Sequence, residues 1–321
     1  MVITPDVTNL PFIVKKGIKY FELTAEHVQR ELLPGFLING LGYNGSIPGP
    51  TIQVYPGEYV NIRVYNKLLE PTSIHWHGLD VPNVMDGVTG VEPSPKIEPN
   101  SYFDYKFRIT NPPGTHMYHS HFNSEQEMLG LGGAFIILDP YESLCNIQRD
   151  YFIMLQEFHV KGLKMGEVKP GVYDIDPMSH DFNFFTMNGR CFPYTTPLKV
   201  QRGENVRVRL GNIVMEAHPI HIHGHQFLIT ASDGNIIPYY NQLKKNTINV
   251  ASGETWDIIF KTDNPGIWPF HCHIPHHMTN NMSKSMGGMF TTISSIIYQN
   301  IYPTKFTFND INHIIHLRGY I

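Results

Sequence analysis

Short stretches in which apolar and polar residues alternate recur along the chain and predict β-strands. Examples are TIQVY at 51–55 and YVNIRVYN at 59–66 in the first part, and NVRVRLGN at 205–212 in the second. Turn residues follow at short intervals, such as the IPGP segment at 47–50. Short alternating strands separated by frequent turns are typical of a β-sandwich.

One segment, TAEHVQREL at 24–32, also suits a helix by residue preference alone. The neighbouring strands and Pro34 compete with a helix there, so we expect a strand. The prediction for the whole chain is therefore all-β.

Two segments share one plan and indicate an internal duplication. Residues 51–66 and 198–212 each contain an apolar strand, a turn in which Gly precedes Glu, and a strand that alternates Val or Ile with Arg or Asn. A His-x-His pair follows shortly after each of them. Repetition of this kind predicts two tandem sandwich domains. We place them at 1–145 and 146–321, linked through 141–182, and assign no function to the tail at 298–321.

The composition suits a globular protein with two cores and argues against some partners. The chain has 321 residues, of which 41% are hydrophobic and 16% charged, and its formal net charge is -4. The absence of basic runs argues against nucleic acid or an anionic membrane surface. No stretch approaches the roughly 18 apolar residues of a membrane span. Residues 1–20 lack a signal-peptide pattern, so we expect a cytoplasmic protein unless an export signal has been removed.

The chain has three cysteines, too few for a disulfide framework. Cys272 stands among metal-ligand residue types, which leaves Cys145 and Cys191. We expect these two to be buried thiols, with a single bridge between them as the alternative.

Histidine occurs eighteen times, and most of these residues fall into four clusters. In each cluster two histidines stand two positions apart, which places both imidazoles on one face of a strand. The pairs are His75 and His77, His119 and His121, His221 and His223, and His271 and His273. One pair alone is as consistent with a structural role as with metal binding, and imidazole suits copper, zinc, iron and nickel alike. Four pairs, two in each predicted domain, favour metal sites.

The fourth cluster contains a second set of ligands. Because side chains alternate across a strand, Cys272 points away from His271 and His273. His277 stands five residues after Cys272, and Met282 stands five residues further on. A thiolate, two imidazoles and a weak axial thioether make a blue copper site for electron transfer. The second imidazole must come from elsewhere in the chain.

Four motifs, taken in order, resemble the copper-binding motifs of the multicopper oxidases. They are HWHG at 75–78, YHSH at 118–121, HPIHIHGH at 218–225 and HCHIPHHMTNNM at 271–282, and the resemblance covers about residues 18–295. It implies a copper cofactor, with one type 1 ion and a trinuclear cluster. The implied type 1 ligands are His218, Cys272, His277 and Met282, and the implied type 2 ligands are His75 and His221. The implied ligands of the type 3 pair are His77, His119, His121, His223, His271 and His273.

The same resemblance implies a fold and an assembly. The fold is a tandem pair of cupredoxin-like Greek-key β-sandwiches, and the link at 141–182 is too short to hold the middle domain of three-domain relatives. The chain thus resembles the two-domain, laccase-type branch, in which the first domain of one subunit meets the second domain of its neighbour. Such head-to-tail contacts must close into a ring, and the implied assembly is a homotrimer with trinuclear clusters between subunits. Ser120 stands where copper nitrite reductases have cysteine, which confines type 1 copper to the second domain.

The implied activity is a laccase-like oxidation of phenols or aromatic amines, with O2 reduced to water. Cys272 and the adjoining peptide would carry electrons toward His271 and His273. Asp86, in VMDGV, resembles an acid that the family uses to supply protons, but an Asp-Gly pair is also a common turn. Relatives carry a further acid in or after the HCH motif, where this chain has Pro275 and Met278, so the second proton donor is unassigned.

Two other functions stay open. A copper nitrite reductase is the weaker alternative because of Ser120, and because its mononuclear catalytic copper would not need eight paired histidines. A copper-tolerance protein or cuprous oxidase is the second alternative, in which Met278, Met286 and Met289 would dock cuprous ions near Met282. Such methionines more often fill a core.

Overall fold

Alternation along several strands buries one side of the strand in a sandwich core, whereas strands such as β8 (Gly114–His119) and β9 (Gly132–Ile137) are buried on both sides. In β5 (Tyr59–Asn66), Val60, Ile62 and Val64 are buried, whereas the intervening Arg63 is partly exposed. This gives each sheet an apolar face that must pack against another sheet.

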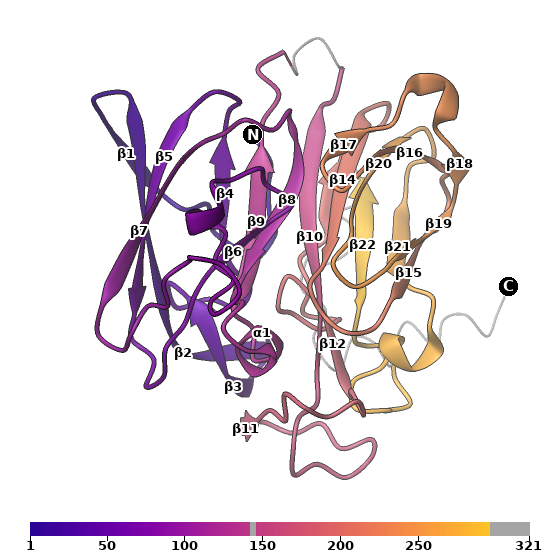
Figure 1. The fold of residues 1–321 in the computed structure, drawn as a ribbon. Helices are drawn as coiled ribbons and strands as arrows, with labels where there is room; N and C mark the ends of the chain where they lie inside the picture. The colour runs from indigo at the N-terminus through magenta and orange to yellow at the C-terminus, as the bar shows by residue number, and fades with distance from the viewer. Residues whose placement is uncertain (142–145, 296–321) are drawn as a thin grey trace, which may run out of the picture.

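The computed structural model describes residues 1–141 and 146–295, whose strands form four sheets (Figure 1). The six-stranded sheet contains β1 (Phe12–Lys15), β2 (Ile18–Leu33), β3 (Phe36–Tyr43), β5, β7 (Tyr102–Arg108) and β11 (Gly171–Asp174). The four-stranded sheet contains β4 (Gly49–Val54), β6 (His75–His77), β8 (Gly114–His119) and β9 (Gly132–Ile137). Together these two sheets form the first sandwich.

The second sandwich also consists of two sheets. The seven-stranded sheet contains β10 (Arg149–Phe158), β12 (Phe184–Met187), β14 (Asn205–Asn212), β16 (Phe227–Ser232), β17 (Asn235–Ile236), β18 (Lys244–Lys245) and β20 (Thr255–Lys261). The five-stranded sheet contains β13 (Leu198–Val200), β15 (His218–Ile222), β19 (Thr247–Val250), β21 (Ile267–Cys272) and β22 (Phe290–Ser295). Short helical segments are α1 (Ser124–Met128), η1 (Asn83–Met85), η3 (Tyr239–Asn241) and η4 (Pro275–Met278).

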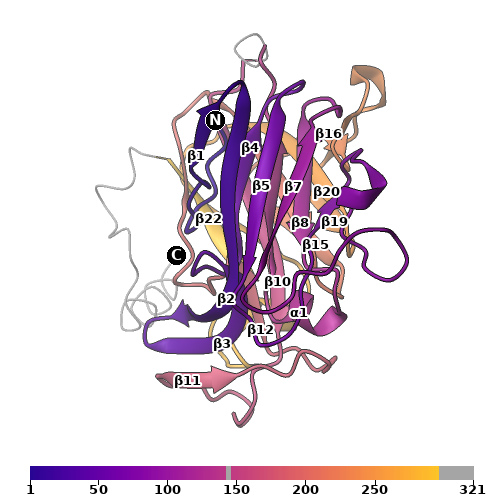
Figure 2. The ribbon, with the colours of Figure 1, turned by 60° about the vertical axis from the view of Figure 1, so that its left-hand side comes forward.

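The four sheets stack as four layers. In Figure 1 the two sheets of the first sandwich lie at the left, and those of the second lie at the right, where they overlap in this view. β8 and β9 of the first sandwich pack against β10, β14 and β20 of the second and share an apolar cluster with them. Figure 2 shows β2 and β5, which pair in parallel, running along the outer face of the first sandwich. The two sandwiches therefore meet through sheet faces.

The chain also crosses back between the sandwiches. β11 follows β10 in sequence, yet it pairs in parallel with β3 of the first sandwich. Near this crossing, Phe158 and Phe184 share an apolar cluster with Phe36 and Ile38. The link between the halves is thus part of the packed structure.

A buried polar network joins the two sandwiches. Arg209 of β14 donates to Asp257 at 3.1 Å and to Asp150 at 2.8 Å. Arg209 also donates at 2.7 Å to the hydroxyl of Thr115, which belongs to β8 of the first sandwich. Because all four side chains are buried, each charge depends on its partners for compensation.

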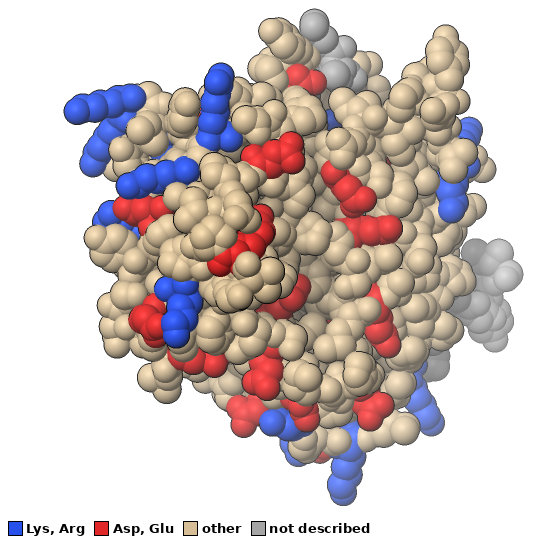
Figure 3. Space-filling model, viewed as in Figure 1, with Lys and Arg blue, Asp and Glu red and all other residues tan. Residues whose placement is uncertain are grey.

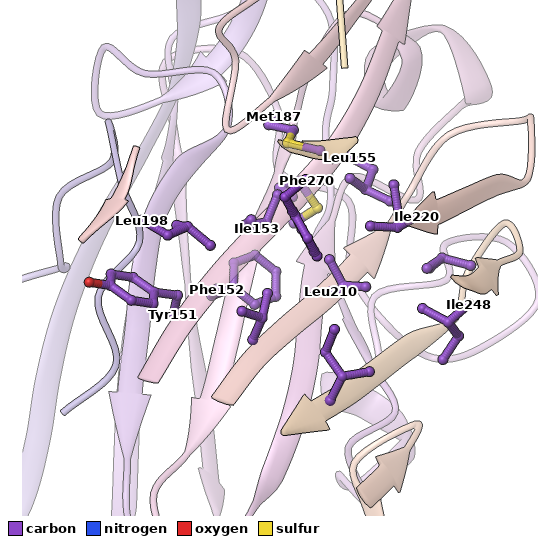
Figure 4. Packing of buried hydrophobic residues seen from close by; sticks show 14 of the residues in the cluster. Tyr151, Phe152, Ile153, Leu155, Met187, Leu198, Leu210, Ile220, Ile248 and Phe270 are labelled. Atoms are coloured by element: carbon purple, nitrogen blue, oxygen red, sulfur yellow. The ribbon is translucent and has the colours of Figure 1, made fainter. Parts of the chain in front are cut away.

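The second sandwich has the core that holds the candidate site. Figure 4 shows Phe152 of β10 and Leu210 of β14 near Ile220 of β15 and Phe270 of β21. Cys272, at the end of β21, belongs to the same apolar cluster. Cys272 is therefore buried in the apolar core, away from solvent.

The all-β prediction is confirmed, and residues 24–32 lie within the long strand β2. Cys191 is a buried free thiol, whereas Cys145 and the tail at 298–321 lie outside the described residues. No helix in the described ranges has the length and apolar character needed to cross a membrane. On the face seen in Figure 3, acidic side chains are spread over the middle and basic ones lie mostly at the margins.

Candidate metal centres

Three ligand-type side chains meet in the core of the second sandwich. His218 begins β15, Cys272 ends β21, and His277 lies in η4 just beyond it. The pairing of β15 with β21 brings the first two together. Cys272 Sγ lies 4.0 Å from His218 Nδ1 and 3.5 Å from His277 Nδ1, and the two nitrogens are 3.2 Å apart. All three residues are 0% exposed.

Carboxylates behind both imidazoles determine which nitrogen faces the cysteine. Glu157 Oε2 lies 3.4 Å from His218 Nε2, and Glu216 Oε2 lies 3.0 Å from His277 Nε2. Each carboxylate thus lies behind an Nε2 atom, and Nδ1 of both rings lies on the side of Cys272. Burial lowers the pKa of His277 to about 3, so this ring is neutral near pH 7.

The donor set fits a copper ion. Two buried lone pairs directed at each other repel unless a cation lies between them. Burial raises the pKa of the Cys272 thiol to about 12, so a metal ion must displace its proton to obtain the thiolate. One thiolate with two imidazoles is the set found in blue copper sites. Phe185 stacks on His277 with ring centroids 3.8 Å apart and shields the cluster.

Met282, the predicted fourth ligand, differs from the other three residues. Its side chain is 46% exposed, and it follows η4 in the left-handed region with φ of 57°. The structure thus brings together three of the four predicted type 1 ligands and leaves Met282 at the surface.

A second ligand group lies in the first sandwich. His75, His77, His119 and His121 line a cavity of about 240 Å³ together with Glu127. β6 pairs with β8 so that His75 lies opposite His119. His77 Nδ1 is 3.2 Å from His119 Nε2, and the ring centroids of His75 and His121 are 5.6 Å apart. Burial lowers the pKa of His119 to about 3, which keeps its ring neutral. The two sequence pairs therefore form one patch of imidazoles.

Asp86 lies against this patch. Its carbonyl oxygen is 3.0 Å and its Oδ2 is 3.3 Å from His75 Nδ1, which leaves Nε2 of that ring for a metal. Gly87 follows with φ of 93°, and a Cβ there would lie 1.8 Å from the Ile74 carbonyl oxygen. Asp86 therefore caps η1, and the close approach of Gly87 to Ile74 holds Asp86 against His75.

Glu127 is a further acid beside the patch. Its Oε1 lies 3.3 Å from His119 Nδ1, and burial raises its pKa to about 7. It belongs to α1, where SEQEM looks like an ordinary surface helix in the sequence. No local pattern distinguishes Glu127, so only the tertiary structure could find it.

A third ligand group lies on the five-stranded sheet. His221 of β15 is opposite His271 of β21, and His223 Nε2 lies 3.0 Å from His271 Nε2. The rings of His221 and His273 have centroids 5.4 Å apart. Nδ1 of His221 lies 2.8 Å from the Asn246 carbonyl oxygen, which leaves Nε2 free. His223 and His273 are exposed, so this group opens to solvent.

The two histidine groups are separate within the chain. Among the described residues, no ligand-type cluster combines histidines from both groups. One group lies at β6 and β8 of the four-stranded sheet, and the other lies at β15 and β21 of the five-stranded sheet, in the right half of Figure 1. Each is therefore half of the predicted eight-histidine set.

Cys272 joins the buried cluster to the open group. Its thiol enters the core while His271 and His273 face the open group, as strand alternation predicts. The carbonyl oxygen of Cys272 also lies 2.8 Å from His271 Nδ1. The two groups are thus connected by the peptide bonds on either side of Cys272 and by one hydrogen bond.

Glu157 and Glu216 are site residues that the sequence prediction missed. Glu157 carried a signal, because it is a charged residue inside the apolar strand YFIMLQEF and is 0% exposed. Glu216 carried none, since it is a single acid in the short connection between β14 and β15. Of the other histidines, His276 packs on His277 with ring centroids 4.3 Å apart, and His225 Nδ1 lies 3.2 Å from the His223 carbonyl oxygen.

Two multicopper oxidase family models match the chain, over residues 25–142 and 166–287. The crystal structure of a blue copper oxidase from Nitrosomonas europaea is 31% identical, with a TM-score of 0.76, and the match covers 91% of this chain and 92% of that one. The chain belongs to the multicopper oxidase family. It is an oxidoreductase of two cupredoxin-like sandwiches with copper as its cofactor, as the sequence resemblance implied.

Curated relatives carry different descriptions. A probable nitrite reductase-hydroxylamine oxidoreductase fusion protein of Kuenenia stuttgartiensis is 30% identical over 84% of this chain and 31% of its own length. Copper resistance protein A of Escherichia coli is 30% identical over 67% of this chain and 42% of its own length. Laccases also match. The chain spans less than half the length of these relatives, which leaves substrate and reaction to be argued from its own residues.

Replacing Cys272 by Ser removes the thiolate and should abolish the blue absorption band and oxidase activity, while the open histidine groups still bind some copper. Absorption spectroscopy and copper analysis of the purified variant test this. Cys191→Ser is the matched control, because among the described residues it removes the second buried free thiol and should leave the band intact. A blue, active Cys272→Ser protein would contradict the assignment.

Proposed function

We propose that the protein is a laccase-like multicopper oxidase that takes single electrons from phenols or aromatic amines and reduces O2 to water. The observation that supports this is the link through Cys272 between a buried Cys-His-His cluster and an open histidine group. Bound copper supplies one-electron acceptance in the first and reduction of O2 in the second. In this proposal, His218, Cys272 and His277 hold type 1 copper.

The remaining ligand roles follow the same proposal. His75 and His221, whose Nδ1 atoms are occupied by oxygen partners, hold type 2 copper through Nε2. The type 3 pair is held by His77, His119, His121, His223, His271 and His273. Cys272 and its peptide bonds carry electrons to His271 and His273.

Electron donors are proposed to approach at Glu216. Its side chain is 39% exposed and contacts His277, so it connects the surface to the buried cluster. The exposed His276 lies beside it. A phenol hydroxyl or an aromatic amine seated here would donate a hydrogen bond to the Glu216 carboxylate, which places the donor next to a copper ligand.

The proposed assembly is a homotrimer. Each chain carries two separate groups of four histidines, and the second group is open to solvent. A neighbouring copy can complete each half, and a head-to-tail contact that repeats must close into a ring. The trinuclear clusters then lie between subunits.

A copper nitrite reductase has less support than an oxidase. One relative carries that description in its fusion-protein name. However, Ser120 donates to Gln126 Oε1 at 2.7 Å in the first sandwich, where a type 1 site would need a thiolate. Eight paired histidines also exceed the needs of a mononuclear catalytic site.

A cuprous oxidase is favoured by one observation. Glu216 and His276 lie within ligand distance of each other and of His277, and this group reaches the surface. A cuprous ion held there would sit beside the electron entry point. The copper resistance relative is consistent with this second candidate.

Copper analysis and O2 uptake test the proposed function together. We expect about four copper ions per chain and phenol-dependent O2 uptake without release of hydrogen peroxide. O2 uptake with cuprous ion in place of the phenol tests the cuprous oxidase. Nitrite-dependent release of nitric oxide tests the nitrite reductase. A copper content of about one or two per chain, or nitrite reduction without O2 uptake, would overturn the oxidase proposal.

Mixing two defective variants tests whether the clusters lie between subunits. His77→Ala disables the first-domain group and His223→Ala disables the second-domain group, so each variant alone should be inactive. In randomly mixed trimers about a quarter of the interfaces pair two intact groups, so co-expression should restore about a quarter of the activity. No recovery on co-expression would place both halves of a cluster in one chain.

Replacing Asp86 by Asn tests the proposed proton supply. The amide keeps the shape of the loop but cannot deliver a proton, so kcat for O2 reduction should fall by roughly a hundredfold. The blue band should be unchanged, since Asp86 contacts His75 and not the buried cluster. Asp80→Asn, at an exposed acid on the same segment, is the control and should retain full activity.

A further inference from the structure

We propose that Met289, and not Met282, supplies the axial sulfur of the copper site formed by His218, Cys272 and His277. The inference rests on the proposed function only in taking this cluster as the type 1 site. It changes the residue that tunes the copper potential, because the axial donor sets that potential.

The backbone of Met289 is bonded to two of the three ligands. Its N–H donates to the His277 carbonyl oxygen at 2.8 Å, and its carbonyl oxygen accepts from the Cys272 N–H at 3.0 Å. The residue is 0% exposed and belongs to the same apolar cluster as Cys272. The Met289 backbone therefore lies beside two of the three donors, and its side chain is buried in the apolar cluster that also contains Cys272.

Two glycines allow the chain to return to His277. Gly288 has φ of 60°, and a Cβ there would lie 2.1 Å from the His277 carbonyl oxygen. Its N–H donates to Asn280 Oδ1 at 2.8 Å, and a Cβ on Gly287 would lie 2.4 Å from Asn280 Nδ2. Residues 280–288 therefore form a loop that is closed at its base, and Met289 is the first residue after the loop.

Met282 lies on the outer part of this loop. The preceding residue, Asn281, is 4% exposed and donates to the carbonyl oxygens of Lys164 and Glu167, both at 2.8 Å. With Asn281 anchored, Met282 is left 46% exposed. Moving its sulfur into the core would break this anchor and bury a residue that now has a left-handed backbone.

The loop also explains why residue spacing pointed to Met282. Met282 stands ten residues after Cys272, whereas Met289 stands seventeen residues after it. A spacing rule counts residues along the chain, but a ligand is selected by its position after folding. The loop adds residues between Cys272 and Met289 but does not move Met289 away, because the two ends of the loop are hydrogen-bonded to each other.

Substitution of each methionine separates the two candidates. Met289→Leu removes the thioether at nearly constant volume, so the fold is kept and cupric copper loses a donor. We expect its type 1 reduction potential to rise. Met289→Gln introduces an amide oxygen that favours cupric copper, and we expect its potential to fall and its electron paramagnetic resonance spectrum to change. Met282→Leu is the matched control and should shift neither potential nor spectrum.

Redox titration of the blue band and electron paramagnetic resonance measure these shifts without any assay of turnover. A shift in Met282→Leu with none in the two Met289 variants would overturn the inference, as would unshifted potentials in all three. If the unsubstituted protein loaded with copper had no blue band, the type 1 assignment itself would be refuted. A blue protein that does not reduce O2 would refute the oxidase proposal and leave the test of Met289 valid.

Discussion

The opposite directions of neighbouring side chains in β21 are the constraint on which both candidate sites depend. Cys272 enters an apolar core, and His271 and His273 face the other way into an open histidine group. A strand cannot send adjacent residues to the same side, so one tripeptide necessarily serves two environments. The core of the sandwich surrounds Cys272 with apolar residues, and the surface of the sheet leaves the histidine group accessible to solvent. In the proposed oxidase, electron entry and reduction of O2 are thus separated while staying one residue apart.

The oxygen atoms behind the imidazoles make these groups usable as metal ligands. Glu157 and Glu216 face the outer nitrogens of the buried pair, while Asp86 does the same for His75. Each contact orients its ring and leaves the other ring nitrogen facing inward. A buried carboxylate is costly without a positive partner, and in the proposed site a copper ion bound to the histidine would supply one. In that proposal the carboxylates and the metal ion stabilise each other.

The four-layer arrangement explains why one chain holds two incomplete histidine groups. The four-stranded and seven-stranded sheets pack face to face, which leaves β15 and β21 in an outer layer. The buried network around Arg209 ties the sandwiches together, so neither can turn to bring its histidines to those of the other. In the proposed trimer this rigidity is useful, because each chain presents both halves at fixed positions. Assembly then becomes a condition for O2 reduction but not for the buried cluster.

The fold class and the histidine pairs could be predicted from the residues alone, because alternation and i, i+2 spacing are local properties. The strand at 24–32, the separate Cys272 cluster and the contact of Asp86 with a histidine could all be anticipated from neighbouring residues. Glu127 and Glu216 could not, since each comes from a segment without a distinctive pattern. Met289 is the clearest case: spacing favoured Met282, yet folding closes a loop and puts the later methionine against Cys272 and His277. Residue spacing is set along the chain, whereas burial and contact are set by packing, and only the tertiary structure decides those.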